Sequence, residues 1–178
     1  METKFKKQIQ DLKNQSPEFG AYVELLVEED QRLSKMIQDV TNEFVKVAQE
    51  KKFPLKNGTV DKDIFGVVPY KAVYGNNIPA SKWKFVDTKK GTSEKTMFDV
   101  ATKMPLVQAI AQCTQMLKNG TFDVPGTFRE IFLMETQNGK PLKLCCYRYP
   151  EDLLYLHVYT VSRHRVWLVP NFAWLVYK

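Results

Sequence analysis

Cys145 and His157 are the residues whose types and spacing could carry out catalysis in this chain. A three-residue turn at 150–152 between two predicted strands places Cys145 opposite His157. An imidazole beside a thiol lowers the thiol pKa and gives a thiolate nucleophile. Glu130 on the same face of the sheet, or Asp152 in the turn, could orient the ring. The pair is therefore a candidate dyad for a small cysteine enzyme.

The three cysteines and two histidines do not form a metal-binding pattern. Cys145 and Cys146 are adjacent, so on a strand their side chains point to opposite faces and do not bond to each other. A turn one residue longer or shorter would place Cys146 beside His157 instead. The chain has no CxxC pair, and His157 and His164 lie seven residues apart. We expect reduced thiols, a cytoplasmic location, no structural zinc and no cofactor.

The middle of the chain carries the positive charge, which raises the hypothesis of a nucleic-acid-binding protein. Residues 51–103 hold eleven basic and five acidic side chains, whereas residues 15–50 hold three basic and eight acidic ones. The whole chain has a net charge of +6. Such an asymmetry bears on the partners of a protein rather than on its fold.

The stretch SKWKFVDTKKG, residues 81–91, alternates lysines with large aromatic residues. On a strand, its first two lysines point to one side and Trp83 and Phe85 to the other, which favours an edge strand with lysines in water. The two lysines that follow in a turn are freer to reach a phosphate. The candidate nucleic-acid contacts are Lys82, Lys84, Lys89 and Lys90.

A long amphipathic helix is predicted to begin at Ser16-Pro17-Glu18 and to run to about Lys52. Ser is a good N-cap, Pro suits the first turn and an acid stabilises the helix N-terminus. Apolar residues continue along a heptad frame, interrupted by Asp30. Such a helix either packs on the sheet of its own domain or pairs with another helix as a coiled coil. The frame consists of Phe5, Ile9 and Leu12 upstream, one seam of Phe19, Leu26, Leu33, Val40 and Val47, and another of Val23, Asp30, Ile37 and Phe44.

One further helix and several strands are predicted beyond this segment. A helix begins at Thr92 or Ser93, Pro105 kinks or restarts it, and Asn119-Gly120 ends it. Asn138-Gly139 indicates a two-residue hairpin turn, because both positions of such a turn have positive φ. Short strands are predicted at 64–68, 70–74 and 82–87, and an antiparallel meander at 128–137, 140–149, 153–161, 166–169 and 172–177.

Counting back from the hairpin turn gives the register and the two faces of the meander. Gln137 pairs with Lys140, and Phe132 is then expected opposite Cys145. The aliphatic face, expected under the helices, consists of Ile131, Leu133, Leu142, Leu144, Cys146, Leu154, Leu156, Val158 and Thr160. The other, which we call the tyrosine-rich face, consists of Glu130, Phe132, Met134, Lys143, Cys145, Tyr147, Tyr149, Tyr155, His157 and Tyr159.

The tyrosine-rich face is the candidate binding surface. A tyrosine ring can be buried while its hydroxyl keeps a polar partner, which suits a half-exposed position. The face could be covered by the chain itself, by another protein or by stacked bases. The residues expected to bind are Phe132, Lys143, Tyr147, Tyr149, Tyr155, His157 and Tyr159.

These patterns together predict one α+β domain over residues 1–178, with 1–52 as a helical arm or packing helix. A long N-terminal amphipathic helix and a Pro-kinked central helix are expected to pack on one face of a mainly antiparallel sheet. No apolar run reaches the length of a membrane span, so we expect a soluble protein. The function expected first is non-enzymatic binding or assembly through self-association or a protein partner, followed by nucleic-acid binding and then by a small Cys/His-dependent enzyme.

Overall fold

The structure, a computed structural model, describes residues 2–53, 83–87, 91–150, 153–162, 164–165 and 172–177. The strands predicted at 64–68, 70–74 and 166–169 lie outside these residues. Within the described ranges, none of the helices combines the length and the apolar composition needed to cross a membrane.

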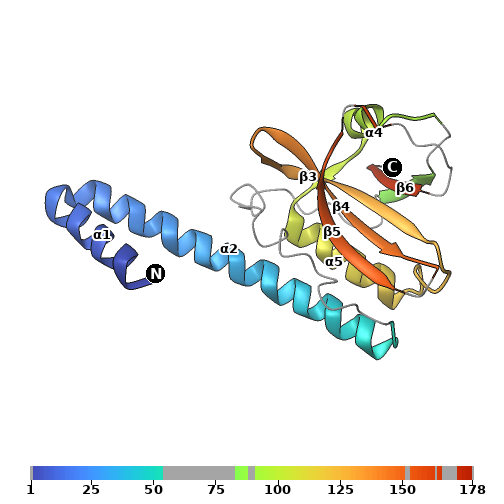
Figure 1. The fold of residues 1–178 in the computed structure, drawn as a ribbon, viewed down its shortest axis with the longest axis horizontal. Helices are drawn as coiled ribbons and strands as arrows, with labels where there is room; N and C mark the ends of the chain where they lie inside the picture. The colour runs from blue at the N-terminus through green and yellow to red at the C-terminus, as the bar shows by residue number, and fades with distance from the viewer. Residues whose placement is uncertain are drawn as a thin grey trace.

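Two N-terminal helices form an arm that extends beyond the sheet (Figure 1). Helix α1 spans Glu2–Gln15 and helix α2 spans Pro17–Glu50. Ser16 occupies the N-cap of α2 in an extended conformation, as its place before Pro17 predicts. Helix α1 folds back along the outer end of α2 (Figure 1), and we call this pair of helices the helical arm.

The C-terminal half of α2 packs on the domain. Its buried apolar residues lie against helix α5, which spans Leu106–Lys118. Spacings of three, four and seven residues place them on one face of the helix. They are Ile37, Phe44, Val47 and Ala48. The expectation of a helix packed on its own domain is therefore met by this half of α2.

Pro105 restarts the central helix rather than kinking it. Helix α4 covers only Glu94–Val100, and the short strand β2, Lys103–Met104, separates it from α5. Pro105 is the N-cap of α5 because its fixed φ of −60° and extended ψ of 146° suit the residue before a first turn. Ser93 caps α4 by accepting a hydrogen bond from Thr96 N at 3.1 Å.

Among the described residues, six strands form one mixed sheet in the order β1-β6-β3-β4-β5, with β2 beside β3. The hairpins β3–β4 and β4–β5 form the expected antiparallel meander. The last strand departs from that meander, because β6 pairs parallel with β3 and antiparallel with β1. The strand bounds are Trp83–Asp87 for β1, Phe128–Gln137 for β3, Lys140–Arg148 for β4, Leu154–Thr160 for β5 and Phe172–Tyr177 for β6.

The register of the β3–β4 hairpin is as predicted at its turn and wrong further along. Gln137 pairs with Lys140, and Asn138 and Gly139 both have positive φ. Between Phe132 and Thr136 a β-bulge shifts the pairing, so Cys145 lies opposite Glu130 and not opposite Phe132. The shift amounts to two residues. It therefore keeps every side chain on its predicted face, since the side-chain period of a strand is two.

The aliphatic face of the sheet forms the main core with α2 and α5 as predicted. From Ile131 to Val158 its members belong to one buried cluster, and Thr160 alone among them is exposed. Helix α4 does not join this layer. Its Met97 packs with Phe132 on the opposite face, where Phe98 meets the Phe132 ring edge to face at 5.6 Å. The two parts of the predicted central helix thus pack into two different cores, α5 into the main core and α4 into a smaller one on the opposite face of the sheet.

Candidate functional site

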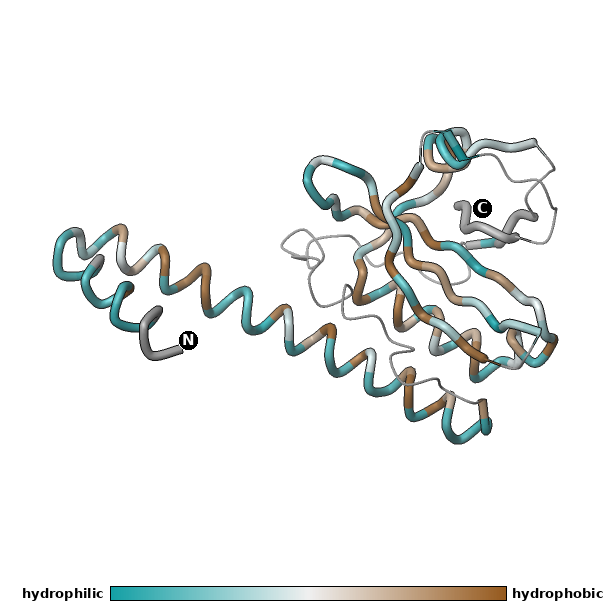
Figure 2. The backbone as a smooth tube through the Cα atoms, in the orientation of Figure 1, coloured by the Kyte–Doolittle hydropathy of each residue, from teal (hydrophilic) through white to brown (hydrophobic). Residues whose placement is uncertain are grey.

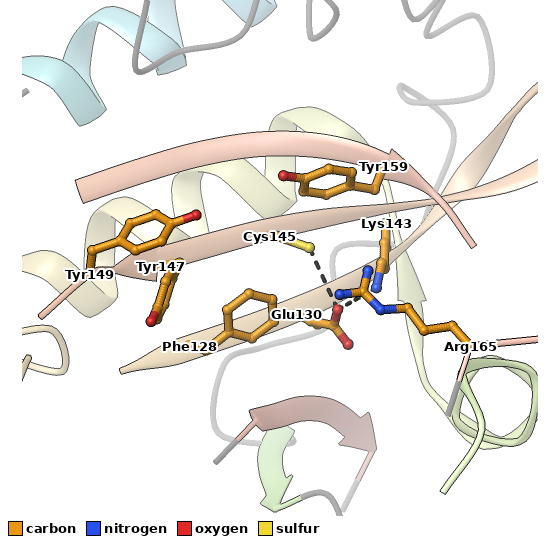
Figure 3. A pocket seen from close by; sticks show the side chains of 8 residues that line it. All are labelled: Phe128, Glu130, Lys143, Cys145, Tyr147, Tyr149, Tyr159 and Arg165. Atoms are coloured by element: carbon orange, nitrogen blue, oxygen red, sulfur yellow. Dashed lines mark hydrogen bonds and ion pairs between the residues drawn. The ribbon is translucent and has the colours of Figure 1, made fainter. Parts of the chain in front are cut away.

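Three adjacent strands place aromatic rings around an open pocket of about 400 Å³ on the tyrosine-rich face (Figure 3). Phe128 comes from β3, Tyr147 from β4 and Tyr159 from β5, and Tyr149 follows the end of β4. Successive rings touch one another, with centroids 5.3 Å apart for Phe128 and Tyr147 and 4.2 Å apart for Tyr147 and Tyr149. We call this site the tyrosine pocket; its lining consists of Phe128, Glu130, Lys143, Cys145, Tyr147, Tyr149, Tyr159 and Arg165.

The rim of the pocket presents polar groups to a ligand. The side chains of Tyr149 and Tyr159 are 39% and 45% exposed, and their hydroxyls point toward each other above Cys145 (Figure 3). Burial raises the pKa of Tyr159, so its hydroxyl stays a hydrogen-bond donor at neutral pH. Aromatic walls with a few converging polar groups are typical of binding pockets.

The floor of the pocket is a buried ionic network. Lys143 Nζ donates to Glu94 Oε1 at 2.6 Å and to Glu130 Oε1 at 2.5 Å, and the three side chains are at most 1% exposed. The Cys145 thiol donates to the same Glu130 oxygen at 3.6 Å. A charge in the protein interior is tolerated when it is paired and hydrogen-bonded, and this network fulfils both conditions.

The pKa values of Glu130 and Lys143 in this floor differ from the ordinary values of these side chains. Burial raises the pKa of Glu130, against the opposing charge and hydrogen bond of Lys143. Burial alone would lower the pKa of Lys143, but the neighbouring Cys145 and Glu130 and the hydrogen bonds to Glu130 and Glu94 raise it on balance. Lys143 therefore stays a cation at neutral pH. Titratable groups with perturbed pKa values are typical of functional sites and also of structural ion networks.

Glu94 connects the pocket floor to helix α4 and to the chain after β5. Its Oε2 accepts a hydrogen bond from Ser162 N at 2.8 Å, and its backbone N–H donates to the Arg165 carbonyl at 3.0 Å. The Arg165 side chain returns to Glu94 Oε1 at 3.5 Å and lines the pocket. One buried carboxylate thereby holds α4, β4 and one rim of the pocket together.

The register between β4 and β5 brings Cys145 opposite His157, as the three-residue turn predicts. The chemistry of the pair does not favour a nucleophile. Burial raises the pKa of the Cys145 thiol well above its ordinary value, and the thiol donates to Glu130. The ring centroid of His157 lies 3.8 Å from that of Tyr159. All three cysteines are free and buried, while Asp152 lies outside the described residues.

The seven residues predicted to form the binding face divide into three groups. Tyr147, Tyr149 and Tyr159 line the tyrosine pocket, and Lys143 lies beneath it. Tyr155 and His157 are half-buried beside it, and the Tyr155 ring lies 4.9 Å from Tyr149. Phe132 is not on the open surface, because α4 covers it. Within the described part of the chain, no three His, Cys, Asp or Glu side chains gather where they could hold a metal ion.

The predicted nucleic-acid contacts are only partly visible. Lys84 lies on β1 and is exposed, as expected of an edge-type strand. Lys82, Lys89 and Lys90 lie outside the described residues, as do the side chains of Trp83 and Phe85.

A second candidate surface lies on the outer half of α2. Four large apolar side chains there are half or more exposed: Phe19 at 53%, Tyr22 at 58%, Leu25 at 64% and Leu26 at 51%. Figure 2 shows hydrophobic positions along α2 both beside the sheet and beyond it. We call these four residues the apolar stripe.

The apolar stripe continues the face of α2 that is buried farther along. Leu26 lies seven residues before Leu33, and Phe19 lies seven before Leu26, so all three share one side of the helix. Leu33 is 1% exposed, whereas Leu26 is 51% and Phe19 is 53% exposed. The first of the two predicted seams is therefore buried at Leu33 and Val47 and exposed at Phe19 and Leu26.

Sequence reasoning missed Glu94 and misjudged the burial of Glu130 and Lys143. Alternation places the latter two on the correct face, but no local signal shows that this face is closed over them. Glu94 lies 49 residues from Lys143 in the chain, and it resembles an ordinary acid in the first turn of a helix.

Comparisons of the chain with protein-family models, with curated proteins and with solved structures found no match.

Proposed function

We propose that this chain is a non-enzymatic binding or assembly protein that docks a partner protein on the apolar stripe of α2, with the tyrosine pocket as a second contact surface. The exposure of the apolar stripe carries the proposal. Large contiguous apolar surfaces on a folded protein mark interaction sites, because water disfavours their exposure.

The size of the apolar stripe is sufficient for recognition of a helix. Burying one leucine side chain is worth roughly 1.5–3 kcal/mol, so a few such residues can supply the central anchors of an interface. Anchors spaced three, four and seven residues apart are the pattern by which helices pack against each other. The outer half of α2, which carries the stripe, extends beyond the sheet (Figure 1).

The two alternative functions have less support. A thiolate at Cys145 is disfavoured by burial, which counts against a cysteine nucleophile. Nucleic-acid binding stays a prediction that rests on the lysine-rich middle of the chain. The outer half of α2 does not support it, because residues 17–31 contain five acids and no Lys or Arg, and these would repel phosphates.

The test uses the full chain and a fluorescent helical peptide with a leucine face and glutamine elsewhere. Leu26→Glu should weaken peptide binding about tenfold or more, because it replaces an anchor with a charge that must be desolvated. Gln38→Glu introduces the same charge at an exposed position of α2 away from the stripe and should leave the affinity unchanged. Equal affinity of wild type and Leu26→Glu would contradict the proposal.

The tyrosine pocket contributes rings that are well suited to contact another protein. Tyr149 and Tyr159 combine a large apolar ring with a hydroxyl that can meet a polar group, and tyrosine is enriched at interaction hot spots. Replacing both with serine should weaken the partner complex without unfolding the protein, because both rings lie at the rim. Met134→Ser, at a 43% exposed position of β3 outside the pocket lining, is the control.

A further inference from the structure

We infer that the apolar stripe of α2 receives a basic amphipathic helix from a different protein, and not a second copy of α2. This inference rests on the proposed function above and adds the chemistry of the partner. Charge around the stripe, the internal packing of α1 and the cost of pairing two α2 helices carry it.

Acidic side chains are interspersed with the residues of the apolar stripe and follow them along α2. At the i,i+4 spacing, Glu18 is a neighbour of Tyr22, Leu25 of Glu29, and Leu26 of Asp30. Glu18 and Asp30 are exposed. Glu29 is bound by Arg32, whose guanidinium donates to it at 2.6 and 2.8 Å. A partner helix whose apolar face lies on the stripe would bring its flanking residues beside these acids.

The chain already packs a basic helix on the neighbouring side of α2. Helix α1 contains four lysines and two acids. Its Ile9 faces the same small hollow as Val27 of α2, and its Lys13 forms an ion pair with Glu24 of α2. The outer half of α2 thus holds helix α1 with an ion pair beside apolar side chains.

Pairing of two α2 helices through their stripes is disfavoured by charge. Residues 17–31 carry five acids and no basic residue. Glu24 is already paired with Lys13 of α1 and Glu29 with Arg32, so the repulsion between two copies would come chiefly from Glu18, Glu28 and Asp30. Like charges across a helical interface destabilise it and are a common device against wrong pairing. Helix α1 of a second copy could not act as the basic partner helix, because it is already packed on the α2 helix of its own chain.

The test titrates the full chain with three fluorescent helical peptides that share one leucine face and differ elsewhere, carrying Lys, Gln or Glu. We expect the Lys peptide to bind about tenfold more tightly than the Gln peptide at low salt, from a few exposed charge pairs, and the Glu peptide to bind weakest. High salt should remove the difference between Lys and Gln peptides but leave the Gln affinity.

Variants of the acids beside the apolar stripe test whether these residues cause the tighter binding of the Lys peptide. Glu18→Gln with Asp30→Asn should abolish the advantage of the Lys peptide. Asp39→Asn with Glu50→Gln makes the same chemical changes at exposed positions of α2 outside the stripe and should keep the advantage. Leu26→Glu should reduce the binding of all three peptides. Circular dichroism and thermal melts establish that each variant is folded.

The outcomes separate the partner chemistry from the docking site. If the three peptides bind equally and Leu26→Glu weakens all of them, the docking site stands and the inference of a basic partner is overturned. A dimer of this chain in light scattering that Leu26→Glu converts to a monomer would overturn the basic partner in the same way. If no peptide shows binding sensitive to Leu26→Glu, both the inference and the proposed function are overturned.

Discussion

Lys143 Nζ lies 2.6 Å from the carboxylate of Glu94, a residue 49 positions away in the chain, and both side chains are 1% exposed. The pair connects a central strand of the sheet to helix α4, and Glu130 completes it from the next strand. Because all three groups are buried, the network should show its effect in stability.

Replacing Lys143 with methionine removes the cation and leaves two carboxylates in the interior. We expect the free energy of unfolding to fall by about 3–5 kcal/mol, the usual cost of leaving a buried charge without its partner. Urea denaturation measures it. Lys140→Met, at an exposed position of the same strand, should change stability by no more than about 0.5 kcal/mol.

A triple variant distinguishes uncompensated charge from poor packing. Lys143→Met combined with Glu94→Gln and Glu130→Gln has no charge left in the network. It should recover a substantial part of the lost stability, because neutral groups are less costly to bury than unpaired ions. A triple variant as unstable as Lys143→Met would show that the shape of the lysine, and not its charge, is required.

Glu135 gives a dependence of stability on pH. It is 2% exposed, and its Oε1 accepts the Leu106 N–H at the start of α5 at 2.9 Å. Burial raises the pKa of Glu135 above its ordinary value, and the hydrogen bond from Leu106 offsets this only in part. The folded protein thus holds this proton more tightly than the unfolded chain. The contribution of Glu135 to the free energy of unfolding is therefore full below the ordinary glutamate pKa and declines as pH rises through the folded value.

Glu135→Gln removes that titration while keeping an oxygen acceptor for Leu106. The stability of wild type minus that of Glu135→Gln, measured by urea denaturation at several pH values, should fall as pH rises from the ordinary glutamate pKa and then level off. Glu50→Gln, at an exposed position, controls for the loss of one carboxyl group. A difference that rises with pH would contradict the assignment.

The thiols should be unreactive in the folded protein. Burial raises the pKa of Cys145 and of Cys146 well above the ordinary value, and Cys113 is fully buried. Thiolate is the reactive form, so iodoacetamide at neutral pH should modify none of the three within the time that labels all of them in urea. Mass spectrometry of digests identifies the sites. Fast labelling of Cys145 in the native state would restore the hypothesis of a Cys145–His157 nucleophile.

Gly20 permits the close approach of α1 and α2. A Cβ at this position would lie 2.5 Å from Lys13 Cα and 2.7 Å from Lys13 N, and backbone atoms cannot move away as a side chain can. Gly20→Ala should therefore displace α1, although alanine favours a helix by about 1 kcal/mol over glycine. Hydrogen exchange should accelerate in α1 and stay unchanged in α5. Ala21→Gln, at an exposed neighbour, should leave α1 protected.

Most of the architecture could be predicted from local patterns. The Ser16-Pro17 start of α2, the Ser93 cap of α4 and the Asn138-Gly139 turn each depend on residues within a few positions of one another. The alternation along β3, β4 and β5 likewise gave the correct faces. The predicted register of β3 was wrong from Phe132 back to Phe128, because a bulge separates these residues from the turn. The bulge lies where β3 also pairs with β2 and where the Glu135 side chain reaches the start of α5.

The candidate site was predictable only in its composition. Alternation brought Tyr147, Tyr149 and Tyr159 to one face, but the pocket between them depends on which neighbours cover Phe132 and which leave the tyrosines open. Glu94 and Arg165 come from other parts of the chain. Their contacts depend on how helices and loops pack on the sheet, a long-range arrangement that no local spacing encodes.

The sequence by itself determined the elements, the two faces of the sheet and the two heptad seams of α2, because these follow from periodicity and from capping and turn residues that act over a few positions. Tertiary structure decided which residues of those seams are buried and which remain exposed, and it decided that Lys143 is buried between Glu94 and Glu130. The physical reason is that burial and ion pairing depend on the distances between segments remote in sequence, which are fixed only when the whole chain has packed.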